Sequence, residues 1–395
     1  MFIFNIMYRQ TTDLLGFKNL IGYALLFLLL FSSCRKEEPV LPSTITNVTN
    51  PVQGTVKGFF LLNEGNMGSN KASLDYFDYE TGDYHCNIYP ERNPNVVKEL
   101  GDVGTDIKIY GGKLYAVINC SNLVEIMDVK TAHHVAAVSI PNCRYITFHK
   151  GYAYVSSYAG PVGVNPSIRR GYVAKIDTVD FKVKAECVVG YQPEEMVVSG
   201  DKLYVVNSGG YMPPVYDNTI SVIDLKTFTE THTIIAGVNM HRMKQDAYGN
   251  IWVSSRGDYG DTPSKTYIID SKTDKVLDVL DLPCSNMALY GDSLLIYSAE
   301  RFQASAVSYA VVNVKTRTIL SRNFITDGTE KGIRMPYGIA VNPKNGEIFV
   351  TDARDYVTPG KLYCFKPDGT KKWDATTGDI PAHIVFTYRS LQAVK

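Results

Sequence analysis

The sequence predicts an all-β protein, a seven-bladed β-propeller with four antiparallel strands per blade. Two observations lead to this prediction. A short sequence motif recurs seven times, and the C-terminal segment resembles the innermost strand of the other repeats. With 45% hydrophobic and 20% charged residues, the chain of 395 residues has the composition of a globular protein.

The recurring phrase consists of apolar residues, then Asp or a polar substitute, then a turn. Its copies are YFDYETG, IMDVKTA, KIDTVDF, VIDLKTF, IIDSKTD, VVNVKTR and CFKPDGT, around Asp78, Asp128, Asp177, Asp224, Asp270, Asn313 and Lys366. A second phrase, such as KLYVVNS from Lys202, precedes each copy. Short alternating or β-branched runs between Gly, Asp and Asn are typical of strands. The copies recur every 43 to 53 residues, which is the spacing of propeller blades rather than of solenoid coils.

The two ends of the repeat region predict how the ring closes. The first copy starts at Phe59 with its second strand and lacks an innermost one. The C-terminal segment IPAHIVF, from Ile380 to Phe386, reads like an innermost strand. We therefore expect it to complete the first blade and remove an exposed sheet edge. The propeller would then comprise residues 56–395.

The N-terminal segment predicts export. Leu20 to Phe31 is a run of apolar residues, too short to span a bilayer, and it follows Lys18 and precedes Ser32, Ser33 and Cys34. This is the pattern of a signal peptide, and the Cys after two small residues is typical of bacterial lipoproteins. We expect residues 1–33 to be removed and Cys34 to carry lipid.

Residues 34–55 have no hydrophobic period and contain several Pro, Thr and Asn residues, so we predict a flexible tether. Arg35, Lys36, Glu37 and Glu38 directly follow the predicted lipidated Cys. This basic-then-acidic start resembles the surface-export signal of Bacteroidetes lipoproteins, and an ordinary charged tether would also account for it.

The charge balance argues against one class of partner. Lys plus Arg and Asp plus Glu each number 40, so the net charge is zero. Nucleic-acid-binding proteins usually carry a basic surplus, and we expect no nucleic-acid partner. Tyr is abundant, with 27 copies, and suits both strands and wet binding surfaces.

Strand order assigns every connection to one of two faces. Within each blade, the turn between the first and second strand and the turn between the third and fourth strand lie on one face. These turns are short and centre on residue pairs such as Gly111-Gly112 and Gly200-Asp201. We call this face the short-loop face. The connections after the second and the fourth strand of each blade share the opposite, long-loop face. Several of these are long, as from Ser157 to Gly171 and from Asn207 to Asn218, and long loops usually carry function.

We predict the binding site on the long-loop face, where Tyr and Arg residues gather and form a typical recognition surface. Mutual covering of loop Tyr and Arg side chains would also explain any single one of them. The predicted ligand-binding residues are Asn63, Glu64, Asn66, Asn119, Tyr158, Arg169, Asn207, Tyr211, Tyr216, Arg256, Tyr259, Arg301, Phe302, Tyr337, Asp352, Arg354 and Tyr356.

The sequence contains no GxSxG elbow, HExxH helix, P-loop or EF-hand loop. His241 and His383 begin innermost strands of the fifth and the first blade, and we expect them to meet only through a ligand. The acids Asp106, Glu194, Glu195 and Asp352 also lie at strand starts or loop bases, where calcium-dependent propeller lactonases use carboxylates. These scattered acids form no motif, so we predict no catalytic residue, metal or cofactor.

Six cysteines remain after Cys34, and none has metal-binding CxxC spacing. Cys120 and Cys143 both fall at the long-loop face, so they are the one pair that we expect could form a disulfide in an oxidising compartment. Otherwise the cysteines would be small buried hydrophobic residues.

The mature chain resembles the YncE-like seven-bladed propeller lipoproteins of Bacteroidetes. The resemblance rests on the lipoprotein start with KEE, the opening LLNEGNMGSNKASLDYFDYETG, and the repeated KLYVVN and SVIDLKT phrases. Within this family the chain is most similar to the cobalamin-binding BtuG group.

The resemblance implies a lipoprotein of the outer membrane that faces the cell exterior. It would capture a corrinoid and pass it to a BtuB-type TonB-dependent transporter. Two alternatives remain: a hydrolase or lactonase with a metal at the channel mouth, and a glycan- or protein-binding surface module.

Overall fold

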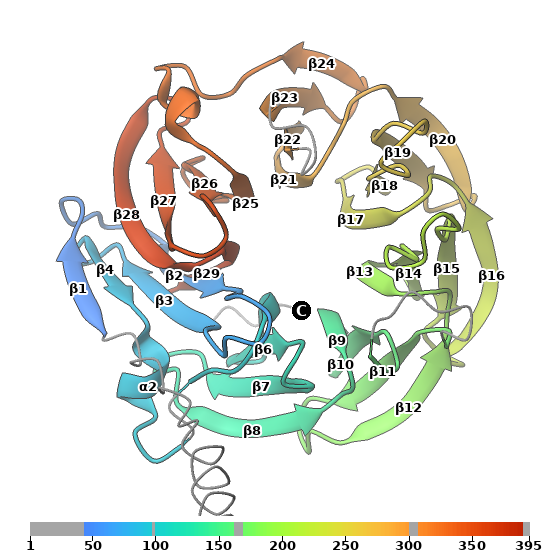
Figure 1. Ribbon diagram of the computed structural model, residues 1–395, viewed down its shortest axis with the longest axis horizontal. Helices are drawn as coiled ribbons and strands as arrows, with labels where there is room; N and C mark the ends of the chain where they lie inside the picture. Colours follow the sequence, from blue (N-terminus) through green and yellow to red (C-terminus); the bar gives the residue numbers. More distant parts are fainter. Residues whose placement is uncertain (1–42, 97–98, 162–168, 300–306, 390–395) are drawn as a thin grey trace, which may run out of the picture. The chain divides into compact units, whose positions relative to one another are not determined.

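A computed structural model describes residues 43–96, 99–161, 169–299 and 307–389. Seven antiparallel sheets form a closed ring, which confirms the predicted seven-bladed propeller (Figure 1). The innermost strands of blades one to seven are β29 (Pro381–Tyr388), β5 (Gly104–Tyr110), β9 (Cys143–His149), β13 (Pro193–Ser199), β17 (Met240–Gln245), β21 (Asn286–Tyr290) and β25 (Pro336–Val341).

The second strands of the blades are short apolar runs that the ring buries except at one or two residues at most, in most blades the first. They are β2 (Val56–Asn63), β6 (Lys113–Ile118), β10 (Tyr152–Ser157), β14 (Lys202–Asn207), β18 (Asn250–Ser255), β22 (Ser293–Ala299) and β26 (Ile348–Asp352). Seven apolar clusters explain this burial, because each one packs two neighbouring blades together. A second strand has a blade interface on each side and therefore loses the polar alternation of a half-exposed strand.

The third and fourth strands form the outer half of each blade. The third strands are β3 (Ser73–Asp78), β7 (Leu123–Asp128), β11 (Tyr172–Asp177), β15 (Thr219–Asp224), β19 (Lys265–Asp270), β23 (Val307–Asn313) and β27 (Pro359–Phe365). The fourth strands are β4 (Asp83–Cys86), β8 (His134–Ser139), β12 (Val183–Val188), β16 (Thr229–Ile235), β20 (Lys275–Leu280), β24 (Thr318–Ser321) and β28 (Lys371–Asp379).

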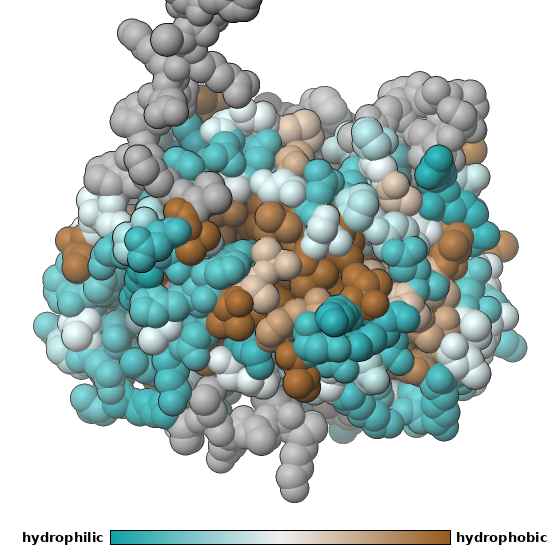
Figure 2. Space-filling view, turned by 90° about the horizontal axis from the view of Figure 1, so that it is seen from below, coloured by the Kyte–Doolittle hydropathy of each residue, from teal (hydrophilic) through white to brown (hydrophobic). Residues whose placement is uncertain are grey.

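The outer strands leave some apolar side chains at the surface. Figure 2 shows the side of the ring that carries β8 and β12, with hydrophobic residues in its middle. Val135 on β8 is 44% exposed and Val188 on β12 is 56% exposed.

The ring closes as predicted, because β29 pairs antiparallel with β2 along its length. The segment that we expected at Ile380 to Phe386 is therefore the innermost strand of the first blade. Blade one also has an addition at its outer edge: β1 (Thr44–Asn47) pairs with β4. This strand lies within the predicted tether and differs from that prediction. The alternation Thr-Ile-Thr-Asn suits a strand, and pairing covers an edge that would otherwise be open.

The repeated Asp has a structural role in the second hairpin of the blades. The Oδ1 atom of Asp128 accepts hydrogen bonds from the N–H groups of Lys130 (2.9 Å) and Thr131 (3.0 Å). Equivalent bonds to Asp177, Asp224 and Asn313 recur in their blades. The fourth residue after each repeated Asp or Asn is left-handed, and its positions are Gly82, Ala132, Phe181, Phe228, Asp274 and Arg317. The repeat is thus the signature of one turn type, in which an Asp side chain caps the backbone.

Within the described ranges, two short helices lie in long loops. They are α2 (Ile88–Arg92), after blade one, and the 3₁₀ turn η1 (Thr329–Gly332), before blade seven. Among the described residues, no helix has the length and apolar character needed to cross a membrane.

Candidate functional site

The innermost strands begin at the long-loop face, and most of them begin with an irregularity. In blades three, four, five and seven, the pairing with the second strand breaks at the second and third residue. β-bulges of this kind redirect side chains and are common beside functional sites. Here they place polar side chains from successive residues at the start of each strand, including Arg144 and Tyr145, Glu194 and Glu195, and His241 and Arg242.

Hydroxyl groups on the second strands compensate for the broken ladder. Ser156 Oγ accepts the N–H of Tyr145 at 3.1 Å, and Ser254 Oγ accepts the N–H of Arg242 at 2.9 Å. In blade seven, Thr351 Oγ1 accepts the N–H of Gly338 at 2.6 Å. The motifs YVSS, WVSS and FVTD on these strands therefore support the bulges, and this fixes the backbone of the site.

The first cluster at the mouth of the ring is built around Glu194. Its Oε2 atom accepts hydrogen bonds from Arg144 Nε at 3.2 Å and Nη2 at 3.1 Å, and its Oε1 atom accepts the hydroxyl of Tyr158. The Arg144 guanidinium also lies 5.0 Å from the centre of the Tyr158 ring. Tyr211 packs edge-on against Tyr158 with ring centres 6.4 Å apart, and 45% of it is exposed. This cluster therefore joins a buried ion pair to an exposed ring.

The second cluster holds His241 between two partners. Arg256 Nη2 donates to His241 Nδ1 at 2.8 Å, and His241 Nε2 lies 2.8 Å from the hydroxyl of Tyr145. A guanidinium can only donate, so Nδ1 is the acceptor and Nε2 carries the proton. Burial lowers the pKa of His241 well below its usual value, and the nearby Arg256 and Arg242 lower it further. His241 is therefore neutral and holds the Arg256 side chain in place.

The structure corrects our expectation that His241 and His383 could meet only through a ligand. Both imidazole rings pack edge-on against the ring of Tyr145, at centre distances of 5.9 Å and 6.4 Å. Tyr145, from the blade between them on one side of the ring, therefore connects them directly.

Glu64, Tyr337 and His383 form the third cluster. The Tyr337 hydroxyl donates to Glu64 Oε2 at 2.8 Å, and Glu64 Oε1 lies 3.5 Å from His383 Nε2. Tyr356 packs edge-on against Tyr337 with ring centres 6.0 Å apart, and Asn66 Nδ2 donates to the carbonyl of Tyr356. Gly338 permits the close packing here, because a Cβ atom would lie 2.2 Å from the Ala382 carbonyl oxygen.

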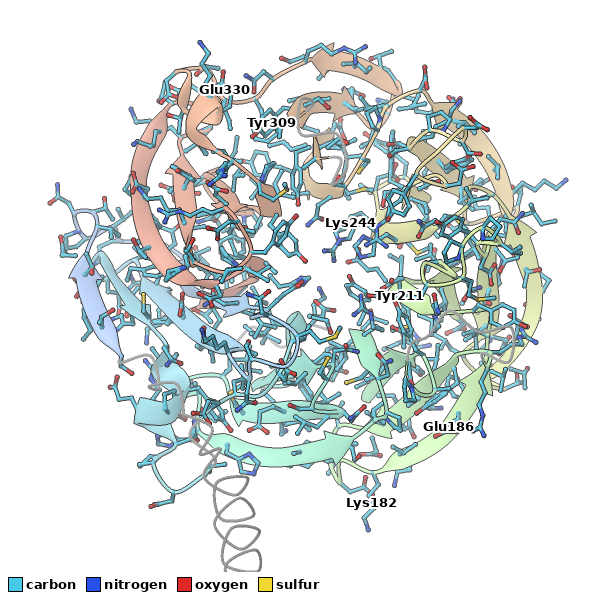
Figure 3. All side chains as sticks on the ribbon, in the orientation of Figure 1. Lys182, Glu186, Tyr211, Lys244, Tyr309 and Glu330 are labelled. Atoms are coloured by element: carbon cyan, nitrogen blue, oxygen red, sulfur yellow. The ribbon has the colours of Figure 1, made fainter. Side chains whose placement is uncertain are left out.

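Charged groups of the same strands form a second layer of contacts. Glu195 accepts hydrogen bonds from Lys244 Nζ and from the N–H of Met243. Burial alone would raise the pKa of the Glu195 carboxyl, but Lys244, Arg242 and Lys108 lower it to about 2. Figure 3 labels Lys244 close to the centre of the ring, whereas Lys182 and Glu186 lie on the outer rim.

The remaining acids also have nearby cations or local hydrogen-bond donors. Asp106 pairs with Lys108 at 3.0 Å and accepts the N–H groups of Ile107 and Ile146. Among the residues that the structure describes, no three His, Cys, Asp or Glu side chains are grouped so that they could hold a metal ion.

Several predicted site residues lie together at the long-loop face. They are Glu64, Asn66, Tyr158, Tyr211, Arg256, Tyr337 and Tyr356, all within the three clusters. Tyr216 and Tyr259 form a further edge-on pair with ring centres 6.3 Å apart, on loops of neighbouring blades.

Four other predicted residues are buried and hold loops rather than face a ligand. Asn63 donates to Ser73 Oγ at 3.0 Å, and Asn119 donates to the carbonyl of Cys143 at 2.8 Å. Asn207 donates to the hydroxyls of Thr219 and Ser221, both at 3.0 Å. Asp352 accepts three backbone N–H groups, including that of Arg354.

Arg169 is exposed at the end of its loop, and Arg354 lines a cleft in blade seven. Arg301, Phe302 and Cys34 lie outside the described residues. Cys120 and Cys143 are not bridged, and all six cysteines of the described part are free. The thiol of Cys143 instead contacts the carbonyl of Leu123 at 3.3 Å.

Sequence reasoning did not assign Arg144, Tyr145 and Arg242 to the site, and it treated Glu194 only as a possible metal ligand. A signal was present, because CRY, PEE and MHR place adjacent polar residues where an innermost strand begins. Regular alternation would have pointed only one residue of each pair toward the ring centre, and the bulges remove that restriction.

Residues 57–387 match the model of a family described as a domain of unknown function, DUF5074. The chain belongs to the DUF5074 family. Among solved structures, it is similar to a hypothetical selenium-binding protein from Sulfolobus tokodaii, with a TM-score of 0.62 and 10% identity. That match covers 85% of this chain and 94% of the other.

Hydrazine synthase from Kuenenia stuttgartiensis is also similar, with a TM-score of 0.50 and 15% identity over 67% of this DUF5074 chain and 77% of that one. At these identities, both likenesses concern the propeller fold alone. A search of the curated proteins finds no match.

Proposed function

We propose that this protein captures a corrinoid such as cobalamin on the long-loop face of its propeller. It then passes the ligand to a BtuB-type TonB-dependent transporter in the outer membrane. In this proposal a lipid on Cys34 anchors the protein at the cell exterior.

The observation that carries the proposal is a set of three tyrosine pairs on the long-loop face. Tyr158 packs against Tyr211, Tyr216 against Tyr259, and Tyr337 against Tyr356, with ring centres 6.0 to 6.4 Å apart. Two of these pairs join loops of neighbouring blades. Because the paired rings are already ordered before a ligand arrives, less side-chain conformational entropy is lost on binding.

A corrinoid suits such a surface. It is a broad and nearly rigid disc, with apolar faces for tyrosine rings, amides around its rim, and a phosphate in its nucleotide loop. Arg256, Asn66 and the exposed tyrosine hydroxyls supply donors for amide and phosphate oxygens. The match between an extended aromatic rim and an extended rigid ligand favours corrinoid over a small substrate.

The carboxylates at the centre of the ring support binding rather than catalysis. Glu194 is paired with Arg144, and Glu195 with Lys244. A carboxylate held by a cation is a poor base and a poor metal ligand, so these contacts favour a rigid scaffold over a hydrolytic centre.

The direct test is isothermal titration of the purified protein with cyanocobalamin. We expect saturable binding at a ratio of one ligand per chain and at micromolar concentration or below. Absence of heat at two temperatures, together with absence of retention in equilibrium dialysis, would contradict corrinoid capture.

The transport part of the proposal has its own test. The protein should co-purify with a TonB-dependent transporter from outer membranes, and protease added to intact cells should remove it. A Cys34→Ala variant should lose membrane association while retaining ligand binding. A protein that protease cannot reach on intact cells would contradict display at the exterior.

A further inference from the structure

Blade seven has a cleft on the long-loop face, with a volume of about 400 Å³. The side chains that matter for its chemistry are Arg334, Asp352, Arg354, Asp355, Lys361 and Tyr363. A cleft of this size falls within the usual range for small-molecule sites. Three of these residues are cations, so the cleft favours a negatively charged group.

One buried carboxylate positions two arginines at this cleft. Asp352 is 2% exposed, and its Oδ2 atom accepts the N–H of Arg334 at 3.1 Å. Its Oδ1 atom accepts the N–H groups of Met335 at 2.8 Å and Arg354 at 2.9 Å. These bonds hold two separate loops against the same carboxylate. The backbones of Arg334 and Arg354 therefore lie on either side of Asp352. The bonds also satisfy the Asp352 oxygens, which leaves both guanidinium groups for other partners.

Neither guanidinium group forms an ion pair or a hydrogen bond with a described residue. No described carboxylate oxygen lies within 4.0 Å of the Arg334 or the Arg354 side chain, and neither side chain hydrogen-bonds to the part of the chain that the structure describes. The third cation is different, because Lys361 Nζ bonds to Asp374 at 2.9 Å. Two unpaired guanidinium groups facing one cleft are well suited to bind the oxygens of a dianion.

Asp355 is the acid that opposes this charge. Its Oδ1 atom accepts hydrogen bonds from the N–H of Thr358, the hydroxyl of Thr358 and the N–H of Val357. These bonds, above all the one from the Thr358 N–H, lower the pKa of Asp355 to about 2, so it remains ionised. It is therefore a built-in repulsion that a variant can remove.

We propose that this cleft binds a phosphate group between Arg334 and Arg354. Tyr356 belongs to the same loop as Arg354 and pairs with Tyr337, so the cleft and this tyrosine pair share one loop of blade seven. The inference rests on the proposed function in one respect: the phosphate belongs to the nucleotide loop of the captured corrinoid.

The test compares cyanocobalamin with dicyanocobinamide, which lacks the phosphate and the nucleotide base. In an Arg334→Gln/Arg354→Gln variant, affinity for cyanocobalamin should fall about 100-fold, since two charge-assisted contacts are lost. Affinity for dicyanocobinamide should stay within about twofold. The matched control is Arg170→Gln, because Arg170 lies on the same face but pairs with Glu230. Equal losses for both corrinoids, or no loss for either, would overturn the inference.

An Asp355→Asn variant should change binding in the opposite direction. Removal of one opposing charge near the surface should tighten cyanocobalamin binding about threefold and leave dicyanocobinamide unchanged. Loss of affinity in this variant would contradict an anion site.

Failure of the proposed function gives a different result. If neither corrinoid binds, titration with inorganic phosphate tests the cleft alone. In NMR spectra, phosphate should shift arginine Nε–H resonances of the natural protein. Loss of these shifts in the double variant would support a phosphate site. Absence of such shifts at millimolar phosphate would overturn it.

Discussion

The short-loop and long-loop faces are made by the same strands, yet they follow different rules. On the short-loop face, blade after blade repeats one turn, with an Asp that caps the backbone and a left-handed residue four positions later. On the long-loop face, each blade contributes different residues, such as Arg144 in blade three and His241 in blade five. Repetition therefore marks what the fold needs, and the departures from it bring together the residues of the candidate site.

The largest effect should come from the buried ion pair at the long-loop face. In an Arg144→Gln variant, the Glu194 carboxyl group would stay buried, at 2% side-chain exposure, without its cationic partner. We expect the free energy of unfolding to fall by about 3–5 kcal/mol, measured by urea denaturation.

The control is the double variant Arg144→Gln/Glu194→Gln, which removes both charges and should recover part of the loss. A single variant within about 0.5 kcal/mol of the natural protein would show that the pair does not hold this face together.

The second effect concerns pH. The pKa values of His241 and His383 are lowered in the folded protein, mainly by burial, so the unfolded chain binds more protons below about pH 6.5. Stability should therefore be full above pH 6.5 and fall as the pH drops from 6.5 to 5. The pKa of Glu195 is lowered from 4.5 to about 2 in the folded protein, by Lys244 first of all. The stability that this carboxylate contributes is therefore lost only below about pH 4.5.

A His241→Gln variant should show a smaller decrease in melting temperature between pH 6.5 and 5 than the natural protein. Asp128→Ala on the other face serves as the control, because it retains both histidines and should keep the full slope. Equal slopes in all three proteins would contradict a neutral buried His241.

On the short-loop face, Asp128→Ala should cost about 1–2 kcal/mol, since two backbone N–H groups lose their acceptor. Ligand affinity should not change. Urea denaturation and titration of the same sample would check both statements, and a change in affinity beyond twofold would break the separation of the two faces.

The smallest effect should be a gain. Arg317 is left-handed with a φ of 59°, a conformation that costs a residue with a side chain about 1–2 kcal/mol. Arg317→Gly should remove that cost and add about 0.5–1 kcal/mol of chain entropy to the unfolded state. We expect a slightly higher melting temperature, and a clear decrease would contradict the turn assignment.

The fold could be predicted because its determinants are local and repeated. The turn around Asp128 needs only residues close in sequence, and seven copies made the pattern unmistakable. The closing strand could also be predicted, because His383 and its neighbours read like other innermost strands. Strand β1 could not, since Thr44–Asn47 has its pairing partner far along the chain, at Asp83–Cys86.

The site was predicted less completely for a physical reason. Loop composition identified Tyr158, Tyr211 and Arg256, but it could not separate them from buried loop supports such as Asn207 and Asp352. Arg144 and Tyr145 escaped prediction because both reach the site only through a bulge. The bulge depends on a residue of the neighbouring second strand, because Ser156 Oγ accepts the N–H of Tyr145. The alternation of residues within the innermost strand alone does not reveal such a bulge.

We expect the long-loop face, and not the short-loop face, to bind the ligand. The most direct measurement is titration with cyanocobalamin of two double variants matched for exposure and residue type. Tyr211→Ala/Arg256→Ala alters the long-loop face, and Tyr248→Ala/Arg317→Ala alters the short-loop face, where Tyr248 is 42% exposed against 45% for Tyr211. We expect the first variant to lose at least about 100-fold in affinity and the second to bind as the natural protein does. Equal affinities in the two folded variants, or a loss in the second alone, would contradict binding at the long-loop face.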